Sequence, residues 1–361
     1  MTSRVSRLKP DPFVLSIVLV VVLASLWPAR DRLAQGLDVA AAVGIALLFF
    51  LHGARLPREA IVQALTHWRL HGLVLATTFV IFPLLGLLLA AIFGGLLSEP
   101  LTLGLVFLGC VPSTVQSSIA FTAIAGGNVA ASVGAAALSN LVGVVLTPLL
   151  VALLVASGEV HGEAGVGTAI RGVALQLLLP FALGQLLRPW LAAWVIRKKA
   201  LVSIIDRGSI LLVVYVAFSA AVVRGLWQAV TGGELALLVL LDALLLAVVI
   251  GITTFMSRLA KLPSEDEITV VFCGSKKSLA TGVPIAGLLF PEAMAGKVLL
   301  PLMMFHQLQL MVMAVIAQRW ARRMKAKRSE AEADTDLTTD AKGRSMHEAG
   351  AGARLDEDVD R

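Results

Sequence analysis

The sequence predicts an all-α integral membrane protein of 361 residues. The mean hydropathy of +0.87 and the charged fraction of 15% lie far outside the range of soluble domains. Apolar runs of about 18 to 25 residues, the length that an α-helix needs to cross the hydrocarbon core, recur along most of the chain. Lys and Arg are distributed unevenly between the connecting segments, as the positive-inside rule requires of a multi-pass protein.

We count ten apolar runs and expect each of them to be a transmembrane helix. In chain order they cover Pro12–Pro28, Gly36–Gly53, Gly72–Phe93, Leu101–Ala125, Val129–Ala156, Gly167–Leu187, Gly208–Val223, Leu235–Met256, Glu267–Phe290 and Val298–Trp320. An even number of spans places both termini on the same side of the membrane.

The cationic connections indicate which side that is. Lys and Arg gather before the first run, after the second, sixth and eighth runs, and after the tenth; the second and sixth connections hold Arg55, Arg58, Arg69, Arg188, Arg197, Lys198, Lys199 and Arg207. Because cationic short segments stay cytoplasmic, we expect both termini in the cytoplasm and the chain in the cell inner or plasma membrane. This bias also explains the net charge of +6, so the lipid bilayer and not a nucleic acid is the expected partner.

Two similar segments suggest an internal repeat. Leu108–Ser118 in the fourth run and Val271–Ser278 in the ninth share a layout around Cys110 and Cys273, which are 163 residues apart. If each half holds five helices, an odd number, the second half must enter the membrane in the opposite orientation. The two cysteines lie within spans and predict no disulfide framework.

The same two segments combine helix breakers with polar groups at mid-span. Pro112 interrupts the fourth run, and Gly274, Gly282 and Pro284 interrupt the ninth around an adjacent pair of lysines. An ammonium in hydrocarbon costs roughly 2.5 to 3.5 kcal/mol, so a lysine pair at this depth indicates function. Irregular backbone in a membrane also needs protein, water or ligand to satisfy it, which favours a buried polar cavity.

These segments resemble the sodium/bile acid cotransporter superfamily, and its SBF-like branch above all. The resemblance rests on Gly109–Ser132, Gly274–Gly282 and Pro301–Gln309, and it covers about residues 10–325. It implies a transporter domain over residues 1–325, made of two inverted five-helix repeats. Helices one, two, six and seven would form a panel, and helices three to five and eight to ten a core with crossing, broken helices four and nine. Residues 326–361 lie outside the resemblance and have the composition of a disordered charged cytoplasmic tail.

The resemblance further implies uptake of an organic anion with two sodium ions. Carried over by position, the ligands of one ion fall at Ser118, Ile119, Ser132, Ala136 and Phe272, and those of the other at Thr78, Phe272 and Lys276. Thr78, Ser118 and Ser132 offer hydroxyl oxygens, whereas the side chains of Ile119, Ala136 and Phe272 cannot bind sodium. We therefore interpret both sodium sites as degraded, with the lysines supplying positive charge in place of the ions.

Polar residues at the depth of the two segments form the candidate site for substrate or ions. The set is Thr78, Ser113, Thr114, Gln116, Ser117, Ser118, Asn128, Ser132, Ser139, Asn140, Asp242, Ser275, Lys276, Lys277, Ser278, His306 and Gln307. We expect one lysine to face the substrate and the other to pair with Asp242, the only carboxylate well inside a span. Such a pair could also carry a coupling proton. Asn128 follows Gly126 and Gly127, which also fits a simple turn.

The sequence therefore favours a secondary transporter of a small organic anion, working by alternating access with sodium or a proton as coupling ion and no other cofactor. No Walker loop, dinucleotide fingerprint or metalloprotease spacing is present, which argues against an enzyme. The alternative is a membrane-embedded regulatory or scaffold protein whose intramembrane lysines are structural.

Overall fold

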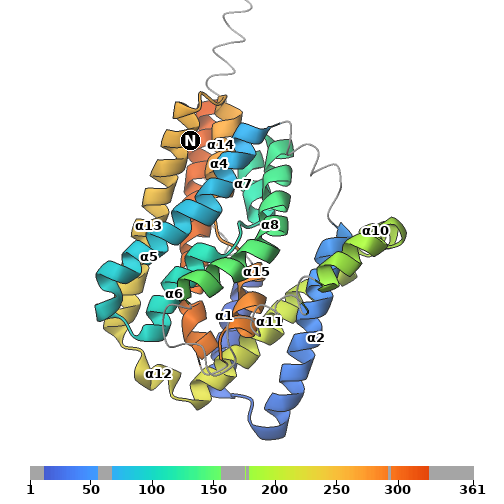
Figure 1. Ribbon diagram of the computed structural model, residues 1–361, viewed down its shortest axis with the longest axis vertical. Helices are drawn as coiled ribbons and strands as arrows, with labels where there is room; N and C mark the ends of the chain where they lie inside the picture. Colours follow the sequence, from blue (N-terminus) through green and yellow to red (C-terminus); the bar gives the residue numbers. More distant parts are fainter. Residues whose placement is uncertain (1–11, 56–66, 156–174, 176–178, 292–293, 325–361) are drawn as a thin grey trace, which may run out of the picture.

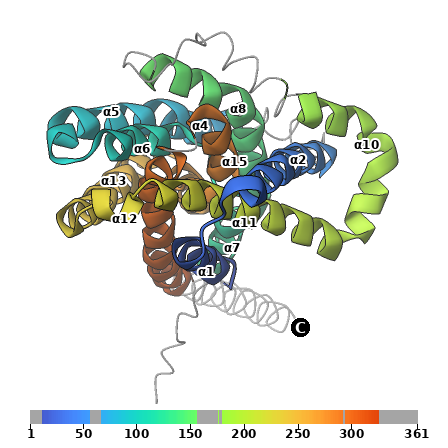
Figure 2. The same cartoon turned by 90° about the horizontal axis from the view of Figure 1, so that it is seen from below.

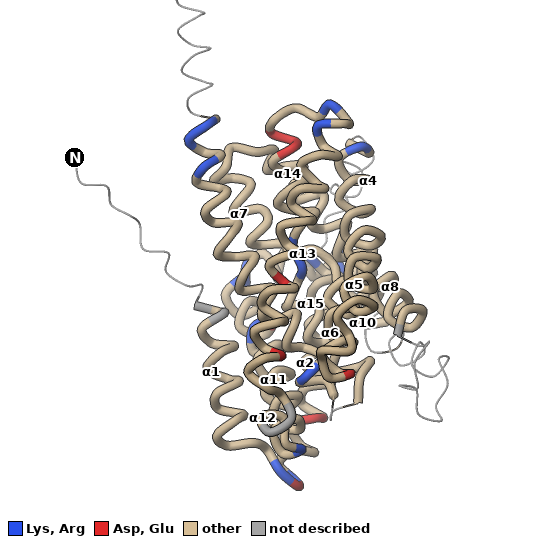
Figure 3. Tube along the Cα trace, turned by 90° about the vertical axis from the view of Figure 1, so that its left-hand side faces the viewer, with Lys and Arg blue, Asp and Glu red and all other residues tan. Residues whose placement is uncertain are grey.

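The computed structural model describes residues 12–55, 67–155, 175, 179–291 and 294–324. Within these residues every regular element is a helix and no strand occurs. Six of the helices are long and apolar enough to cross a membrane. Charged residues lie at the two ends of the bundle and at a few places between them (Figure 3). The described part of the chain is thus an all-helical, multi-pass membrane protein, as the sequence predicts.

The described residues of the first half form a succession of helices and helical turns. They are α1 (Pro12–Leu26), α2 (Asp31–Arg55), α4 (Trp68–Ala76), the π-helical turn η1 (Thr77–Ile81), α5 (Phe82–Phe93), the 3₁₀ turn η2 (Gly94–Leu96), α6 (Glu99–Cys110), α7 (Gln116–Ala125) and α8 (Val129–Val155). The α7–α8 turn begins at Gly126, whose φ of 78° is the left-handed conformation that glycine adopts without strain.

The second half continues in the same manner. Its helices are α10 (Leu179–Arg197), α11 (Lys199–Val223), α12 (Leu226–Ala229), α13 (Gly232–Leu259), α14 (Ser264–Gly274), α15 (Leu279–Leu289) and the helix Met294–Met324. A capping box between Thr231 and Glu234 begins α13, and the Glu234 carboxylate also accepts the Ser98 backbone N–H at 2.8 Å. This contact ties the start of α13 to the start of α6.

The helices form two groups. Helices α1, α2, α10 and α11 pack on one another and are called the panel group here. Helices α4 to α8, α13 to α15 and Met294–Met324 form the core group, in which α14 contacts α4, α7, α8 and α13. Figures 1 and 2 show α2 and α10 at one edge of the molecule and α5 and α13 at the opposite edge. Helix α11 also contacts α15, so the groups meet at the second broken helix.

Two glycines allow α2 and α10 to touch through their backbones. A Cβ added at Gly53 would lie 2.1 Å from the Phe181 carbonyl oxygen, and one added at Gly184 would lie 2.0 Å from the Phe50 carbonyl oxygen. Small residues at such crossings are the usual means of close helix packing in membranes, where no hydrophobic effect separates helices from lipid. The two glycines therefore hold the panel group together.

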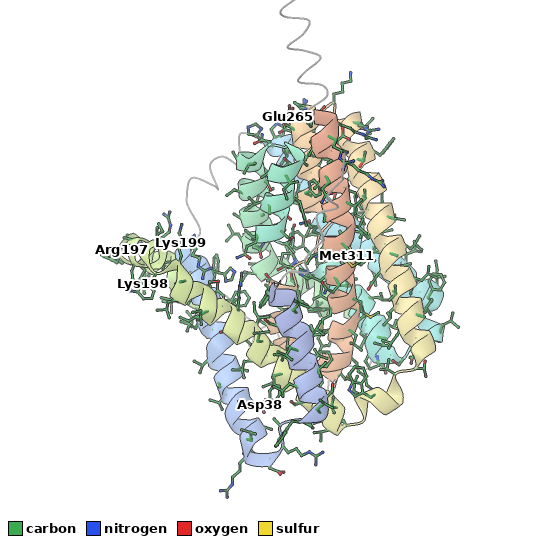
Figure 4. All side chains as sticks on the ribbon, turned by 180° about the vertical axis from the view of Figure 1, so that it is seen from behind. Asp38, Arg197, Lys198, Lys199, Glu265 and Met311 are labelled. Carbon is green, nitrogen blue, oxygen red and sulfur yellow. The ribbon has the colours of Figure 1, made fainter. Side chains whose placement is uncertain are left out.

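The predicted connection between the sixth and seventh helices is wrong in its extent. Arg188 and Arg197 lie within α10, and Lys199 and Arg207 lie within α11. Arg197, Lys198 and Lys199 meet where α10 passes into α11 (Figure 4). Lys and Arg are good helix formers, so a charge ends an apolar run without ending the helix. Arg55, assigned to a connection, is likewise the last residue of α2.

Several predictions fall on residues outside the described ranges. These are the tail 326–361, the position of both chain termini, and the first half of the sixth run, Gly167–Leu187. The ten-helix count and the inverted repeat stay predictions.

Replacing Gly53 or Gly184 by Ala should separate α2 from α10 and destabilise the protein by roughly 1–3 kcal/mol, because a methyl group cannot fit against a carbonyl at this distance. The measurement is the thermal unfolding midpoint in detergent. Gly36→Ala is the matched control, since Gly36 lies on the same helix and a Cβ there would meet nothing within 4 Å. Equal midpoints for all three variants would contradict the packing described.

Candidate functional site

Both helices that were predicted to be broken are broken in the structure. Helix α6 ends at Cys110 and α7 begins at Gln116; α14 ends at Gly274 and α15 begins at Leu279. Pro112 explains the first break, because the residue before a proline avoids helical angles, and Val111 has an extended ψ of 152°. At the second break Ser278 caps α15 by accepting the Thr281 backbone N–H at 3.2 Å.

The two breaks satisfy each other's backbone groups. The Ser278 N–H donates to the Pro112 carbonyl at 2.8 Å. In the other direction the Ser113 hydroxyl donates to the Cys273 carbonyl, and the Ser118 hydroxyl donates to the Phe272 carbonyl at 2.9 Å. A bilayer offers no water to these groups, so the reciprocal bonds fix the crossing.

Side chains of helices α8 and α15 add further hydrogen bonds to the crossing. The Ser139 hydroxyl accepts the Ser113 N–H at 3.1 Å, and the Asn140 amide donates to the Ser113 carbonyl at 2.9 Å. The Asn140 side-chain oxygen accepts the Thr281 hydroxyl at 3.0 Å. Asn140 thereby connects the first break to the start of α15.

Lys277 is the central cation of the crossing. Its side chain is fully buried, and its ammonium lies 4.2 Å from the centre of the Phe82 ring. The ammonium donates to three backbone carbonyl oxygens, those of Thr78 (2.8 Å), Gly109 (2.6 Å) and Val111 (2.8 Å). An ammonium has three N–H donors, so those of Lys277 are all used within the protein.

A proline explains why the Thr78 carbonyl accepts the ammonium. In the π-helical turn the Phe82 N–H bonds to the Thr77 carbonyl, five residues back. The corresponding donor for Thr78 would be the backbone nitrogen of Pro83, which carries no hydrogen. The Thr78 carbonyl therefore has no helical partner, and the lysine supplies one.

The other two carbonyls belong to the end of α6 and the break after it. Gly109 would bond to the Ser113 N–H if the helix continued, but that N–H bonds to Ser139 instead. Val111 lies in the extended break. The carbonyl end of a helix carries a partial negative charge, so an ammonium stabilises it without any carboxylate.

The backbone of Lys277 is held as firmly as its side chain. The Gln309 amide accepts the Lys277 N–H at 2.8 Å and donates to the Lys277 carbonyl at 2.9 Å. The His306 Nδ1 lies 3.3 Å from the same carbonyl and 2.8 Å from the Gln309 nitrogen. The helix Met294–Met324 thus holds the backbone of the lysine through Gln309 and His306.

Lys276 has a different environment. Its ammonium is also fully buried, but it donates to the Ser117 hydroxyl at 3.0 Å and lies 4.4 Å from the centre of the Phe121 ring. Ser117 in turn donates to the Thr114 hydroxyl at 3.0 Å. Lys276 therefore contacts the first broken helix, α6 and α7, through residues of α7.

The predicted ion pair between a lysine and Asp242 is wrong. Asp242 is 1% exposed, and neither of its carboxylate oxygens has a hydrogen-bond partner among the described residues. Thr253 on the same helix packs against Gly274 at the break, and Asp242 lies eleven residues before it, about 16 Å along the axis at 1.5 Å per residue. The position of Asp242 along α13 therefore places its carboxylate too far from the break to pair with a lysine there.

The residues at the implied sodium positions do not fit sodium. The Ser118 hydroxyl is bonded to the Phe272 carbonyl, and the Ser132 hydroxyl accepts from Thr122 at 3.3 Å and lies 3.2 Å from the Cys273 sulfur. The Thr78 hydroxyl has no hydrogen-bond partner among the described residues, but the carbonyl of Thr78 accepts a hydrogen bond from Lys277. Two ammonium groups in this region would repel a further cation.

A cavity of about 340 Å³ lies beside the crossing, between the core and panel groups. Its core wall includes Thr114, Gln116, Ser117, Asn140, Ser278, Thr281 and His306. Its panel wall includes Phe13, Phe49, His52, Arg55, Asp206 and Arg207. Neither lysine is among the residues that line it, and the expectation that one of them faces the substrate stays a prediction.

Most of the predicted site residues are brought together at the crossing, and three are not. Asn128 lies at the turn before α8, where its amide donates to the Asp266 carboxylate at 2.9 Å. Gln307 is half-buried on the last described helix and does not line the cavity, and Asp242 lies apart as stated. Ser275 bonds back to the Val271 carbonyl within α14.

The sequence analysis missed the panel wall of the cavity. Arg55, Asp206 and Arg207 were interpreted only as loop charges or left aside. A signal was present, since His52 and Arg55 are three residues apart and share one face of a helix.

Replacing Lys277 by Met should lower the free energy of unfolding by about 3 kcal/mol or more, because three carbonyls lose their donor at about 1–3 kcal/mol each. Lys276→Met removes one hydrogen bond and should cost clearly less. Chemical or thermal unfolding in detergent measures both, with Lys199→Met on exposed helix surface as the control. A Lys277 variant as stable as the control would contradict the role assigned to this ammonium.

Comparison with known proteins agrees with this architecture. A model of the SBF-like CPA transporter family matches residues 11–322. PA2026 of Pseudomonas aeruginosa is 52% identical over 88% of this chain and 95% of its own. YfeH of Escherichia coli (strain K12), whose name classes it as a candidate symporter, is 49% identical over 90% of this chain and 97% of its own. The sodium/bile acid cotransporter 7-B of Xenopus laevis is 26% identical over 86% of this chain and 91% of its own.

The functions in these names are those of transporters and not of enzymes. The predicted relation to the sodium/bile acid cotransporter superfamily is thereby confirmed. Because the family match extends over most of its length, the chain belongs to the SBF-like CPA transporter family.

Proposed function

We propose that the protein is a secondary transporter that moves a small organic anion across the membrane by alternating access and needs no sodium to do so. The observation that carries this proposal is the pair of buried ammonium groups at the crossing of two broken helices, next to a cavity. Broken helices near the bilayer midplane are where secondary transporters bind their substrates. Positive charge at that position favours an anionic substrate.

The proposed independence from sodium follows from the fact that the positive charges at the crossing belong to lysine side chains. A sodium ion enters and leaves its site, whereas the ammonium groups of Lys276 and Lys277 are covalently attached to the chain. The Lys277 ammonium bonds to the carbonyls at the end of α6 and in the break after it, and the Lys276 ammonium bonds to the Ser117 hydroxyl. No external cation is needed to complete the crossing, and none can be released from it.

The packing supports alternating access between two rigid groups. The panel group is held by the backbone contact between α2 and α10, and the core group by the reciprocal bonds between the two breaks. The cavity lies where the groups meet. A movement of the core against the panel would expose this cavity to one side of the membrane and then to the other.

A proton is the coupling ion that we propose to test. The carboxyl group of Asp242 is buried in α13 of the core and has no hydrogen-bond partner in the described part of the chain, which is unusual for an ionisable group in a span. Intramembrane carboxyl groups of this kind serve as proton relays in transporters. Asp242 would do so independently of the lysines.

The alternative is a regulatory or scaffold protein with structural lysines. The complete internal bonding of Lys277 favours a structural role for that residue. It does not account for the cavity or for the polar residues that line it. Flux of a substrate therefore separates the two functions.

Uptake of labelled organic anions into proteoliposomes should be saturable and should not change when sodium is replaced by choline. Lys276→Ala should reduce uptake to the level of protein-free liposomes, because Ser117 at the cavity wall loses its donor. Lys199→Ala, at the same reconstituted amount, is the control. An imposed proton gradient should stimulate the wild type, and Asp242→Asn should abolish that stimulation.

Flux that requires a sodium gradient would contradict the proposed independence from sodium. The absence of any saturable flux across the anion panel would favour the regulatory alternative.

A further inference from the structure

We infer that the anion-binding group of the cavity is the guanidinium of Arg55 on the panel, with Asp206 as an internal carboxylate that the substrate replaces. This inference rests on the proposed function, since it takes the cavity to hold an organic anion. It assigns the two kinds of positive charge to different tasks. The lysines hold the crossing, and an arginine binds the substrate.

The lysines are not accessible to a substrate in the cavity. Both are 0% exposed, and neither forms part of the cavity wall. All three N–H donors of Lys277 are bonded to carbonyls. Lys276 reaches the wall only through the Ser117 hydroxyl. A positive group that contacts the substrate must therefore come from elsewhere.

Arg55 is such a group. It lines the cavity from the end of α2, and its Nη2 lies 2.5 Å from Oδ2 of Asp206 on α11. The two side chains are 33% and 14% exposed and both residues line the cavity, while Nη2 of Arg55 is itself buried and has no hydrogen bond of good geometry among the described residues. The other carboxylate oxygen of Asp206 has no hydrogen-bond partner among the described residues. The two side chains thus make a single contact and not the bidentate ion pair that a guanidinium and a carboxylate can form.

A substrate carboxylate can form such a bidentate ion pair with Arg55. Arginine binds planar carboxylates through two parallel N–H donors, which is stronger and more specific than one contact. His52 lies one turn before Arg55 and also lines the cavity; its Nδ1 is 2.8 Å from the Leu48 carbonyl. Because a carbonyl only accepts, Nδ1 carries the proton, and Nε2 of the neutral ring is an acceptor that can receive a hydroxyl or amide N–H of a ligand.

The charges of the cavity wall match one negative charge. The charged side chains among the lining residues are Arg55, Asp206 and Arg207, which sum to one positive charge when the lining histidines are neutral. The Arg207 guanidinium lies 5.5 Å from the centre of the Phe13 ring at the same wall. A monoanion neutralises this wall, whereas a dianion or a cation leaves an unbalanced charge in a low-dielectric site.

The rest of the cavity defines the body of the substrate. Leu48, Phe49 and Ile210 give the panel wall an apolar surface beside Arg55, and the core wall presents the hydroxyl of Thr114 and the amide of Asn140. The volume of about 340 Å³ is at the lower end of the range for small-molecule sites. The substrate class is a small amphipathic monocarboxylate with an apolar body and a polar group directed toward the crossing.

The test compares carboxylic acids with their own amides. Labelled aliphatic monocarboxylates of graded length, the matching primary amides and the matching dicarboxylates are bound to the purified full chain in equilibrium binding experiments. The wild type should prefer the monocarboxylate, and Arg55→Gln should weaken its binding about tenfold or more while leaving the amide unchanged. Asp206→Asn should bind the acid more tightly, because the competing carboxylate is gone.

Arg197→Gln is the matched control, since Arg197 is an exposed panel arginine outside the cavity, and its acid-over-amide preference should equal that of the wild type. An Arg55→Gln protein that keeps the wild-type preference would overturn this inference and leave the proposed function intact. A wild type that binds no monocarboxylate would overturn both. If Arg55→Gln does not fold, Asp206→Asn decides: tighter binding of the acid supports the inference, and unchanged or weaker binding overturns it.

Discussion

The structure of the crossing depends on the bonding of one ammonium group to three backbone carbonyls. In a bilayer each carbonyl without a donor costs several kcal/mol, and broken helices create such carbonyls by necessity. Water or a bound cation can satisfy them in other proteins. Here the Lys277 side chain does so from within the chain, which permits α6 to end, η1 to form and the two breaks to approach each other.

The two groups of helices then carry different functions. The core holds two buried ammonium groups, of which that of Lys277 has all three donors bonded, together with a polar wall of hydroxyl and amide groups. The panel presents an arginine and an aspartate that remain in contact with the cavity. Because the cavity lies between these groups, a substrate bound there contacts both of them. In the proposed transport cycle, relative movement of the groups is linked to substrate binding without a sodium ion.

Local chemistry made part of this arrangement predictable from the sequence. Pro112 and Gly274 mark the two breaks, and the lysines stand out because charged residues within apolar runs are rare. The bonds of Lys277 could not be predicted, since its acceptors lie 166 to 199 residues away in sequence and depend on a π-helical turn set by Pro83. Asp242 was assigned as the counter-ion because an apolar run indicates the depth of a residue in the membrane only approximately. It does not indicate which way the residue faces on its helix. Arg55 was overlooked because cations near the end of a run were explained by topology alone.

The central claim is that the Lys277 ammonium, and not a bound cation, satisfies the free carbonyls of the crossing. The most direct measurement is an experimental density map of the full chain in lipid nanodiscs at high sodium concentration and again with sodium replaced by choline. The account predicts the same result in both: the Lys277 ammonium within hydrogen-bonding distance of the carbonyls of Thr78, Gly109 and Val111, and no ion density among them. A sodium ion coordinated by these carbonyls, with the lysine side chain turned away, would contradict it.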